Sequence, residues 1–160
     1  MRIMSDQCRL EDSTSYEETL LEDGSLVTSP SHRILTISGH RLNTPIPGQH
    51  LEAVIAVDQR YLVFVAEGFP FEETLWVYLI DESFEMMDQA TLFAIYSPGE
   101  FRDLQLESSD TLSFSFFYED RWRLTVHQEK KRHIPLFGQP FPVYRQCRFF
   151  RYLTLRRAKL

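Results

Sequence analysis

The most regular pattern in the sequence is an alternation of apolar and polar residues between positions 111 and 126. It occurs in two runs, 111–118 and 121–126, which are separated by Glu119-Asp120. Successive residues of a β-strand point to opposite faces of its sheet, so such alternation is typical of half-buried strands. The pattern predicts a β-hairpin whose buried face carries Leu112, Phe114, Phe116 and Tyr118 in the first strand and Trp122, Leu124 and Val126 in the second.

The same rhythm of strand and turn extends over most of the chain from His32 onward. Short runs rich in Val, Ile, Phe, Tyr and Thr predict strands at 34–37, 51–57, 61–65, 75–80 and 84–90, with Leu51, Ala53, Ile55 and Val57 on one face of the second, and one strand or two short ones over 144–155. Proline-, glycine- and aspartate-containing breaks separate these runs. The fold class expected is all-β: an antiparallel meander forming a barrel, a sandwich or a propeller-like curved sheet.

The first thirty residues are polar and acidic, and they have two interpretations. Ser15–Glu18 fits a capping box for a short helix ending at Gly24. Alternatively, Asp23-Gly24 is the turn of a hairpin, which is favoured because the helix would have under two turns. A chain of 160 residues is the size of one domain. We therefore expect a single domain over 1–160, with an acidic lead-in at 1–30 and a β core at 31–160.

The longest apolar runs, Tyr61–Ala66 and Leu75–Ile80, are too short for a membrane helix of about 20 residues. The acidic N-terminus lacks the apolar run of a signal peptide. Cys8 and Cys147 have no C-x-x-C spacing, which favours two reduced thiols over the alternative of a disulfide joining the chain ends. These features predict a cytoplasmic protein that does not associate with membranes.

Charge is unevenly divided along the chain. Residues 1–120 contain 6 Lys/Arg and 22 Asp/Glu, whereas residues 121–160 contain 11 Lys/Arg and one Asp/Glu. Such asymmetry is typical of an interaction surface. The alternative is that basic C-terminal strands lie beside acidic strands and the two neutralise each other.

Sequence motifs for catalysis are absent: there is no G-x-S-x-G, no H-E-x-x-H and no glycine-rich phosphate loop ending in Lys-Ser or Lys-Thr. His32, His40 and His50 could form a metal site only if the fold brought them together, and surface or hydrogen-bonding roles are favoured. Adjacent carboxylates in turns are expected to face water and stay ionised. We therefore expect no catalytic residues, no metal and no cofactor.

The basic C-terminal segment alternates arginine with aromatic residues, a combination that also binds single-stranded nucleic acids. The pI of about 5.4 argues against nucleic acid as a partner, and the aromatic residues fit a strand's buried face. An acidic protein instead attracts basic proteins. The densest mixture of acidic and aromatic residues is our candidate partner-binding surface, made of Phe69, Phe71, Glu72, Glu73, Trp76, Asp81, Glu82, Glu85 and Asp88.

Three segments, Tyr61–Val65, Pro70–Asp81 and Tyr96–Gly99, together with Phe101 and Leu104, resemble small β-sheet immunity proteins of bacterial contact-dependent inhibition and polymorphic-toxin systems. The resemblance extends over residues 50–130. It implies a non-catalytic protein that binds and neutralises a cognate toxin, for example a nuclease. The alternatives are a structural or assembly β module, and an enzyme with an unrecognised site. An enzyme would have a deep pocket that gathers a histidine or carboxylate with a perturbed pKa, whereas a binding protein would have a flat acidic and aromatic patch.

Overall fold

The computed structural model describes residues 1–12, 19–20, 26–27, 32–68, 73–117, 120–132, 141–145 and 150–158. These segments form β-strands and one 3-10 turn, η1 (Ser5–Gln7), and all strand pairings among them are antiparallel. The predicted all-β antiparallel fold is confirmed. None of the described segments contains a helix with the length and apolar character needed to span a membrane.

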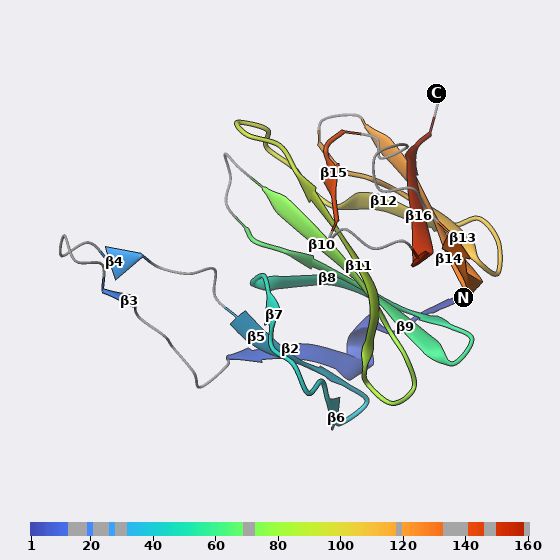
Figure 1. The fold of residues 1–160 in the computed structure, drawn as a ribbon, viewed down its shortest axis with the longest axis horizontal. Coiled ribbons are helices and arrows are strands. Elements are labelled where there is room, and N and C mark those ends of the chain that lie inside the picture. Colours follow the sequence, from blue (N-terminus) through green and yellow to red (C-terminus); the bar gives the residue numbers. More distant parts are fainter. Residues whose placement is uncertain are drawn as a thin grey trace.

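The described strands form four sheets: three are stacked on one another, and the fourth has only two short strands (Figure 1). The central sheet has the order β1 (Arg2–Ile3), β8 (His50–Val57), β9 (Arg60–Ala66), β10 (Thr74–Ile80), β11 (Met86–Phe93) and β15 (Val143–Tyr144). The C-terminal sheet has the order β12 (Arg102–Leu106), β13 (Thr111–Ser115), β14 (Arg121–Arg132) and β16 (Phe150–Arg157). The N-terminal sheet contains β2 (Cys8–Asp12), β5 (His32–Ile37), β6 (His40–Arg41) and β7 (Ile46–Pro47).

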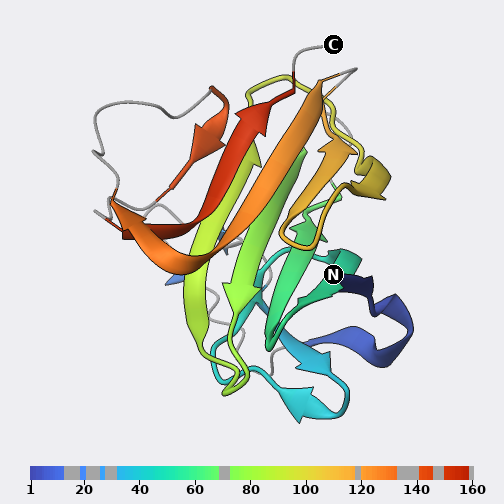
Figure 2. The same ribbon diagram turned by 90° about the vertical axis from the view of Figure 1, so that its right-hand side faces the viewer.

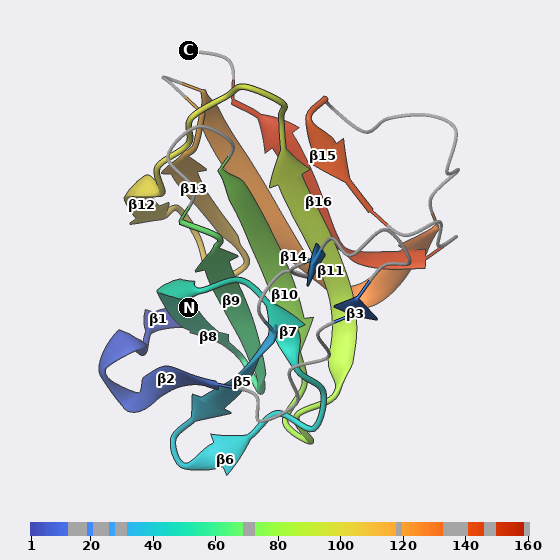
Figure 3. The same ribbon diagram turned by 90° about the vertical axis from the view of Figure 1, so that its left-hand side faces the viewer.

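Each outer sheet covers one face of the central sheet. The C-terminal sheet lies in front of the central strands in Figure 2, and β5 and β7 lie in front of them from the opposite side in Figure 3. This arrangement explains the two longest apolar runs in the sequence, because β9 and β10 need apolar residues on both faces. In β9, Leu62, Phe64 and Ala66 pack towards the C-terminal sheet, and Val63 and Val65 pack towards the N-terminal sheet.

Aromatic residues dominate the core between the central and C-terminal sheets. The Phe64 ring lies 5.0 Å from Phe101 and 5.3 Å from Phe114, measured between ring centroids. Trp122 is fully buried, and its Nε1 donates a 3.1 Å hydrogen bond to the Phe116 carbonyl, which gives its single polar atom a partner. This core joins strands that are far apart in the sequence.

The predicted hairpin over 111–126 is confirmed by the register of β13 and β14, in which Leu112 lies opposite Leu124 and Phe114 opposite Trp122. The sheets remain separate and pack face to face, and no closed barrel is found among the described strands.

One predicted face is wrong. A β-bulge between Leu51 and Ala53 shifts the register of β8, so Leu51 packs towards the N-terminal sheet while Ala53, Ile55 and Val57 pack towards the C-terminal sheet. A bulge adds one residue to a strand and therefore reverses the faces beyond it.

The acidic lead-in is also more integrated than expected. Within the first twelve residues, β1 pairs with β8 and β2 pairs with β5, so this segment contributes to two sheets. The two segments expected to form a hairpin do pair, as β3 (Thr19–Leu20) and β4 (Leu26–Val27), but Leu20 lies opposite Leu26, a register one residue away from that of a two-residue turn at Asp23-Gly24; the turn itself lies outside the described residues. Cys8 donates from Sγ to the Met4 carbonyl at 3.2 Å, and Cys147 lies outside the described residues.

Candidate functional site

The six described residues of the candidate surface do not form one patch. Glu73 precedes β10 and Asp81 follows it, and a seven-residue strand separates its ends by about 20 Å. Asp81, Glu82 and Glu85 lie at the turn between β10 and β11, whereas Glu73 and Trp76 lie towards the other end. Phe69, Phe71 and Glu72 are outside the described residues.

Asp88 was expected at the surface but is buried, with 5% of its area exposed. Its Oδ2 accepts hydrogen bonds from the backbone N–H groups of Tyr152 (2.8 Å) and Leu153 (2.9 Å) in β16. Its Oδ1 accepts from the Gln89 N–H at 2.8 Å, and the Arg145 Nη1 lies 3.4 Å from Oδ2. Asp88 therefore connects β11 of the central sheet to the edge of the C-terminal sheet, and both of its carboxylate oxygens are used in contacts within the molecule.

The acidic residues at the β10–β11 turn have mixed roles. The Asp81 carboxylate accepts 2.9 Å hydrogen bonds from the N–H groups of Ser83 and Glu85, which stabilises the turn. Glu85 is exposed and accepts a 3.2 Å hydrogen bond from the Asn43 amide. Glu82 is exposed. Of the three, only Glu82 and Glu85 present their carboxylates mainly to solvent.

Glu73 is 7% exposed and also has a structural contact. Its Oε1 accepts hydrogen bonds from the N–H groups of Gly68 (2.8 Å) and Thr74 (3.2 Å), so the side chain closes the base of the connection between β9 and β10. Gly68 has a φ of +86°, and a Cβ at this position would lie 2.5 Å from the ring of His50. The connection is thus held tightly where it leaves the sheet.

Trp76 belongs to a continuous row across the central sheet. The register places Val65, Trp76, Thr91 and Tyr144 side by side on β9, β10, β11 and β15. Directly opposed residues in a sheet share a face, so Trp76 and Tyr144 lie on the side covered in part by the N-terminal sheet. Phe93 is on the same face, opposite Thr74, and its ring centroid is 6.3 Å from that of Tyr144.

Large apolar side chains near this edge of the central sheet are exposed. Tyr144 is 49% exposed, and Ile95, Tyr96 and Phe141, which adjoin β11 and β15, are 65%, 83% and 69% exposed. The Phe93 N–H donates to the Pro142 carbonyl at 3.1 Å, which holds the segment before β15 against the end of β11. Large apolar side chains gathered at one edge of a sheet are typical of an interaction site.

A carboxylate completes this face. Glu67 follows β9, and its N–H donates to the Thr74 carbonyl at 3.1 Å, which places it in the row of Thr74 and Phe93. It is 6% exposed, and its Oε2 has no hydrogen-bond partner among the described residues. Burial raises the pKa of Glu67 and the nearby Glu73 raises it further, while a hydrogen bond to Gln49 and the positions of His32 and His50 oppose the shift.

We call this surface the aromatic–acidic face, defined by Glu67, Glu73, Trp76, Phe93 and Tyr144 together with the exposed Ile95, Tyr96 and Phe141. Two of the predicted residues, Glu73 and Trp76, belong to it. Phe93 and Tyr144 were missed because they meet only through pairing of strands that are separated by some fifty residues. Glu67 had a weak signal in the sequence, as the acidic residue that ends an entirely apolar run.

The histidines expected to be surface residues lie at two ends of the molecule. His32 and His50 lie near Glu67, whereas the ring of His40 stacks on Phe84 with centroids 5.3 Å apart. Among the described residues, no group of three His, Cys, Asp or Glu side chains could hold a metal ion. Separately, a depression of about 300 Å³ is lined by Asp6, Gln7, Cys8, Arg9, Thr36 and Gly39 on the N-terminal sheet.

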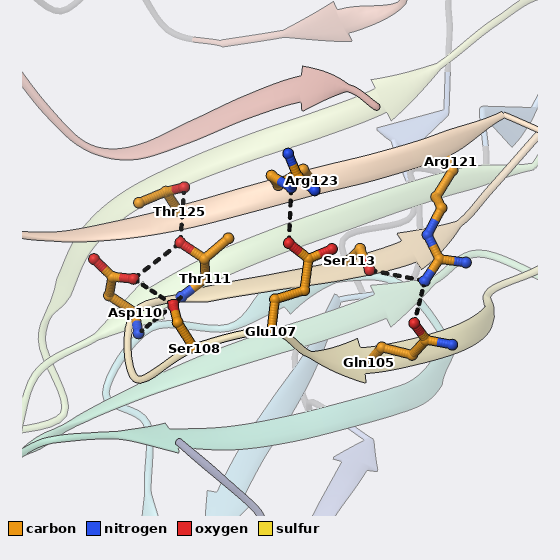
Figure 4. Close-up of polar contacts among 9 residues, drawn as sticks. All are labelled: Gln105, Glu107, Ser108, Asp110, Thr111, Ser113, Arg121, Arg123 and Thr125. Atoms are coloured by element: carbon orange, nitrogen blue, oxygen red, sulfur yellow. Dashed lines mark hydrogen bonds and ion pairs between the residues drawn. The ribbon is translucent and has the colours of Figure 1, made fainter. Parts of the chain in front are cut away.

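The uneven charge is partly compensated on the outer face of the C-terminal sheet (Figure 4). Arg123 of β14 forms a 2.8 Å ion pair with Glu107, which follows β12. Arg157 of β16, which lies opposite Trp122 on the other side of this sheet, forms a 3.0 Å ion pair with Asp120. The compensation is incomplete, because β14 and β16 together carry eight arginines and lysines and one glutamate.

No protein-family model matches the sequence, and neither a curated protein nor a solved structure matches it.

Proposed function

We propose that this chain is a non-catalytic protein-binding module that holds a basic protein partner through the aromatic–acidic face. The observation that carries the proposal is the gathering of Trp76, Phe93 and Tyr144 on one face, beside the exposed Ile95, Tyr96 and Phe141. The two glutamates Glu67 and Glu73 lie at one end of this aromatic group.

Aromatic side chains are the usual anchors of protein interfaces, because they bury a large area with few rotatable bonds. Tyr96 and Phe141 are more than two-thirds exposed, so a partner would remove most of their surface from water. Burial of apolar area contributes roughly 25 cal/mol per Å² to association before the entropic cost of binding is subtracted. This face therefore has a source of affinity that does not depend on charge.

Charge would select the partner and speed its approach. Residues 52–110, which include most of the central sheet, hold 13 acidic residues against Arg60 and Arg102. Glu52 lies close to Glu73 and Glu100, and loss of hydration together with these like charges raises its pKa. A field of this sign attracts basic surfaces, and the attraction weakens as salt screens it.

The basic partner that we propose is a bacterial toxin domain, and the site of action is the cytoplasm. The support is the resemblance to immunity proteins, whose function requires stoichiometric binding without catalysis. Nucleases are among the toxins that fit, since their active sites carry positive charge for a polyanionic substrate. An acidic protein with aromatic anchors would cover such a site by complementarity of charge and shape.

The test begins with purified products of the neighbouring genes, each mixed with this chain at low and at high salt. We expect one basic product to bind one-to-one, more weakly at high salt, and to lose its toxicity when the two are co-expressed. A variant with Tyr96, Phe141 and Tyr144 replaced by serine should lose binding and protection. Phe150→Ser is the matched control, because Phe150 is half exposed but lies on the C-terminal sheet.

Two results would contradict the proposal. One is that no neighbouring product binds at any salt concentration. The other is that a product binds equally well to the wild type and to the triple variant while Phe150→Ser weakens it, which would place the interface on the C-terminal sheet.

A further inference from the structure

The outer face of the C-terminal sheet carries three closely spaced arginines. Arg123 of β14 lies directly opposite Arg156 of β16 in the register, and Arg121 is two residues before Arg123 on the same face. Their side chains point outward because the alternate residues of β14, Trp122 and Leu124, are buried in the core. Side chains directly opposed on antiparallel strands have Cβ atoms about 5 Å apart, so the guanidinium groups of Arg123 and Arg156 can reach one ligand.

Like charges in directly opposed positions are destabilising unless a counter-charge lies between them. Glu107 neutralises Arg123 from the β12 side, since its Oε2 lies 2.8 Å from Arg123 Nε, whereas Arg156 is on the opposite side of β14. Arg121 is held by neutral groups: its Nη2 donates to Gln105 Oε1 at 2.5 Å and to Ser113 Oγ at 2.9 Å (Figure 4). Among the described residues, no ion pair involves Arg121 or Arg156, and Glu107 is paired with Arg123 alone of the three arginines.

The other carboxylates on this face have hydroxyl donors. Asp103 Oδ2 accepts from Ser115 Oγ at 3.1 Å. Asp110 Oδ1 accepts from the hydroxyls of Ser108 (2.7 Å) and Thr111 (2.9 Å), and these two hydrogen bonds lower the pKa of Asp110. Asp110 thus has contacts of its own away from the Arg123–Arg156 pair, whereas the Ser115 partner of Asp103 lies directly opposite Arg121 in the register.

A row of hydroxyl groups lies beside the arginines. Thr111, Thr125 and Thr154 are directly opposed on β13, β14 and β16, and the Oγ1 atoms of Thr111 and Thr125 are 3.1 Å apart. Thr154 Oγ1 is 2.8 Å from His127 Nε2. A ligand held by the arginines would therefore meet additional neutral hydrogen-bonding groups along the same face.

We infer that Arg121, Arg123 and Arg156 form a binding site for a phosphate-type oxyanion on the outer face of the C-terminal sheet. A guanidinium group offers two parallel N–H donors that match two oxygens of a phosphate, and three such groups can surround a tetrahedral anion. The three arginines exceed Glu107 and Asp103 together by one positive charge, and an excess of this sign attracts an anion. The site lies on a different sheet from the aromatic–acidic face and does not depend on the proposed function.

Inorganic phosphate is the probe that tests this site. Its binding is measured by isothermal titration calorimetry at constant ionic strength, with chloride replaced by phosphate. We expect Arg156→Gln and Arg123→Gln each to weaken phosphate binding about tenfold, the loss that follows when charge-assisted hydrogen bonds are removed. Glu107→Gln should strengthen it, because the carboxylate that competes for Arg123 is removed.

Arg9→Gln is the matched control, because Arg9 is an exposed arginine on the N-terminal sheet, ion-paired with Glu11 at 2.7 Å. Circular dichroism should show the same β-sheet content for all variants, since none of the substituted side chains is buried. The proposal is overturned if phosphate does not bind, if Arg9→Gln weakens binding as much as Arg156→Gln, or if Glu107→Gln leaves binding unchanged or weaker.

A second titration distinguishes the two sources of a phosphate group. A short single-stranded oligonucleotide that competes with phosphate, and binds more weakly to Arg156→Gln, would identify the phosphates of a nucleic-acid backbone as the ligand. Phosphate binding that the oligonucleotide does not displace would identify a free phosphate or a phosphorylated small molecule. An oligonucleotide that binds the wild type and Arg156→Gln equally, without displacing phosphate, would exclude the nucleic-acid source.

Discussion

Replacement of Asp88 by alanine is expected to destabilise the fold by about 3–5 kcal/mol, the cost of removing one partner of a buried ion pair. The Arg145 side chain is 3% exposed, and burial lowers its pKa to about 10, so it stays charged at neutral pH and would lose the carboxylate beside it. The N–H groups of Tyr152 and Leu153 would also lose their acceptor.

Arg145→Met should cost less than Asp88→Ala. In that variant the Asp88 carboxylate keeps its three backbone donors, on Gln89, Tyr152 and Leu153. Loss of hydrogen bonds to backbone groups adds about 1–3 kcal/mol per buried group left without a partner. The difference between the two variants in the free energy of unfolding thus measures how much of the stabilisation comes from the hydrogen bonds between β11 and β16 rather than from the ion pair.

The assay is urea denaturation followed by circular dichroism, with thermal unfolding in parallel. A loss of 3–5 kcal/mol in a chain of this size corresponds to a fall in Tm of roughly 10 °C. Glu82→Ala, an exposed acidic residue near the same strand, is the control and should stay within about 0.5 kcal/mol of the wild type. If Asp88→Ala changes the free energy of unfolding by less than about 1 kcal/mol, Asp88 does not connect the two sheets as described.

Three further substitutions test other parts of the structure. Glu67→Gln should be more stable than the wild type at neutral pH, because the pKa of Glu67 is raised in the folded protein. The stability that the protonated Glu67 side chain contributes is fully present below pH 4.5 and is lost as the pH rises through the raised pKa. The difference between the two proteins in urea denaturation should therefore vanish in acid, and a constant difference across pH would refute this. Gly48→Ala should lower the free energy of unfolding by about 1–3 kcal/mol, since φ at Gly48 is +109° and a Cβ would overlap Val65 Cγ1. Gly39→Ala should cost less, because Gly39 has a φ of +83° but no neighbouring atom within 4 Å of an added Cβ. Equal losses in the two variants would show that the overlap at position 48 is relieved. Trp122→Phe should cost about 1–3 kcal/mol in the same assay by removing the indole donor from the Phe116 carbonyl, and an unchanged stability would mean that water replaces it.

Much of the architecture followed from the alternation and length of apolar runs. The β13–β14 hairpin has one face in the core, so its period-two pattern was sufficient to predict it. The continuous apolar runs of β9 and β10 were identified as strands, but their meaning was missed: every residue from Leu62 to Ala66 is buried because a sheet covers each face. Continuous runs of this kind predict a central layer, and the period-two runs predict an outer one.

Other features depended on contacts that no local pattern encodes. The bulge that turns Leu51 to the opposite face has no recognisable signal in the sequence of β8. Asp88 was taken for a surface residue because an isolated acid in a strand is usually exposed, and its partners on β16 are more than sixty residues away. Pairing of β15 with β11 brings Tyr144 to the edge of the central sheet over a similar separation.

The candidate site shows the same limit. The prediction grouped Glu73 with Asp81 because the two residues are close in the sequence. The strand β10 lies between them and separates them by its whole length. The aromatic–acidic face instead gathers residues from the ends of β9, β10 and β11 and from β15. The chemical character of a binding surface was predictable from composition, whereas its members depended on strand order.

The central claim is tested most directly by a binding measurement with the basic product of a neighbouring gene. The wild type is compared with the variant in which Tyr96, Phe141 and Tyr144 are replaced by serine. The account predicts a one-to-one complex that weakens as salt is raised, that is lost in the triple variant, and that is unchanged in Phe150→Ser. A complex with equal affinity for the wild type and the triple variant, insensitive to salt, would contradict it.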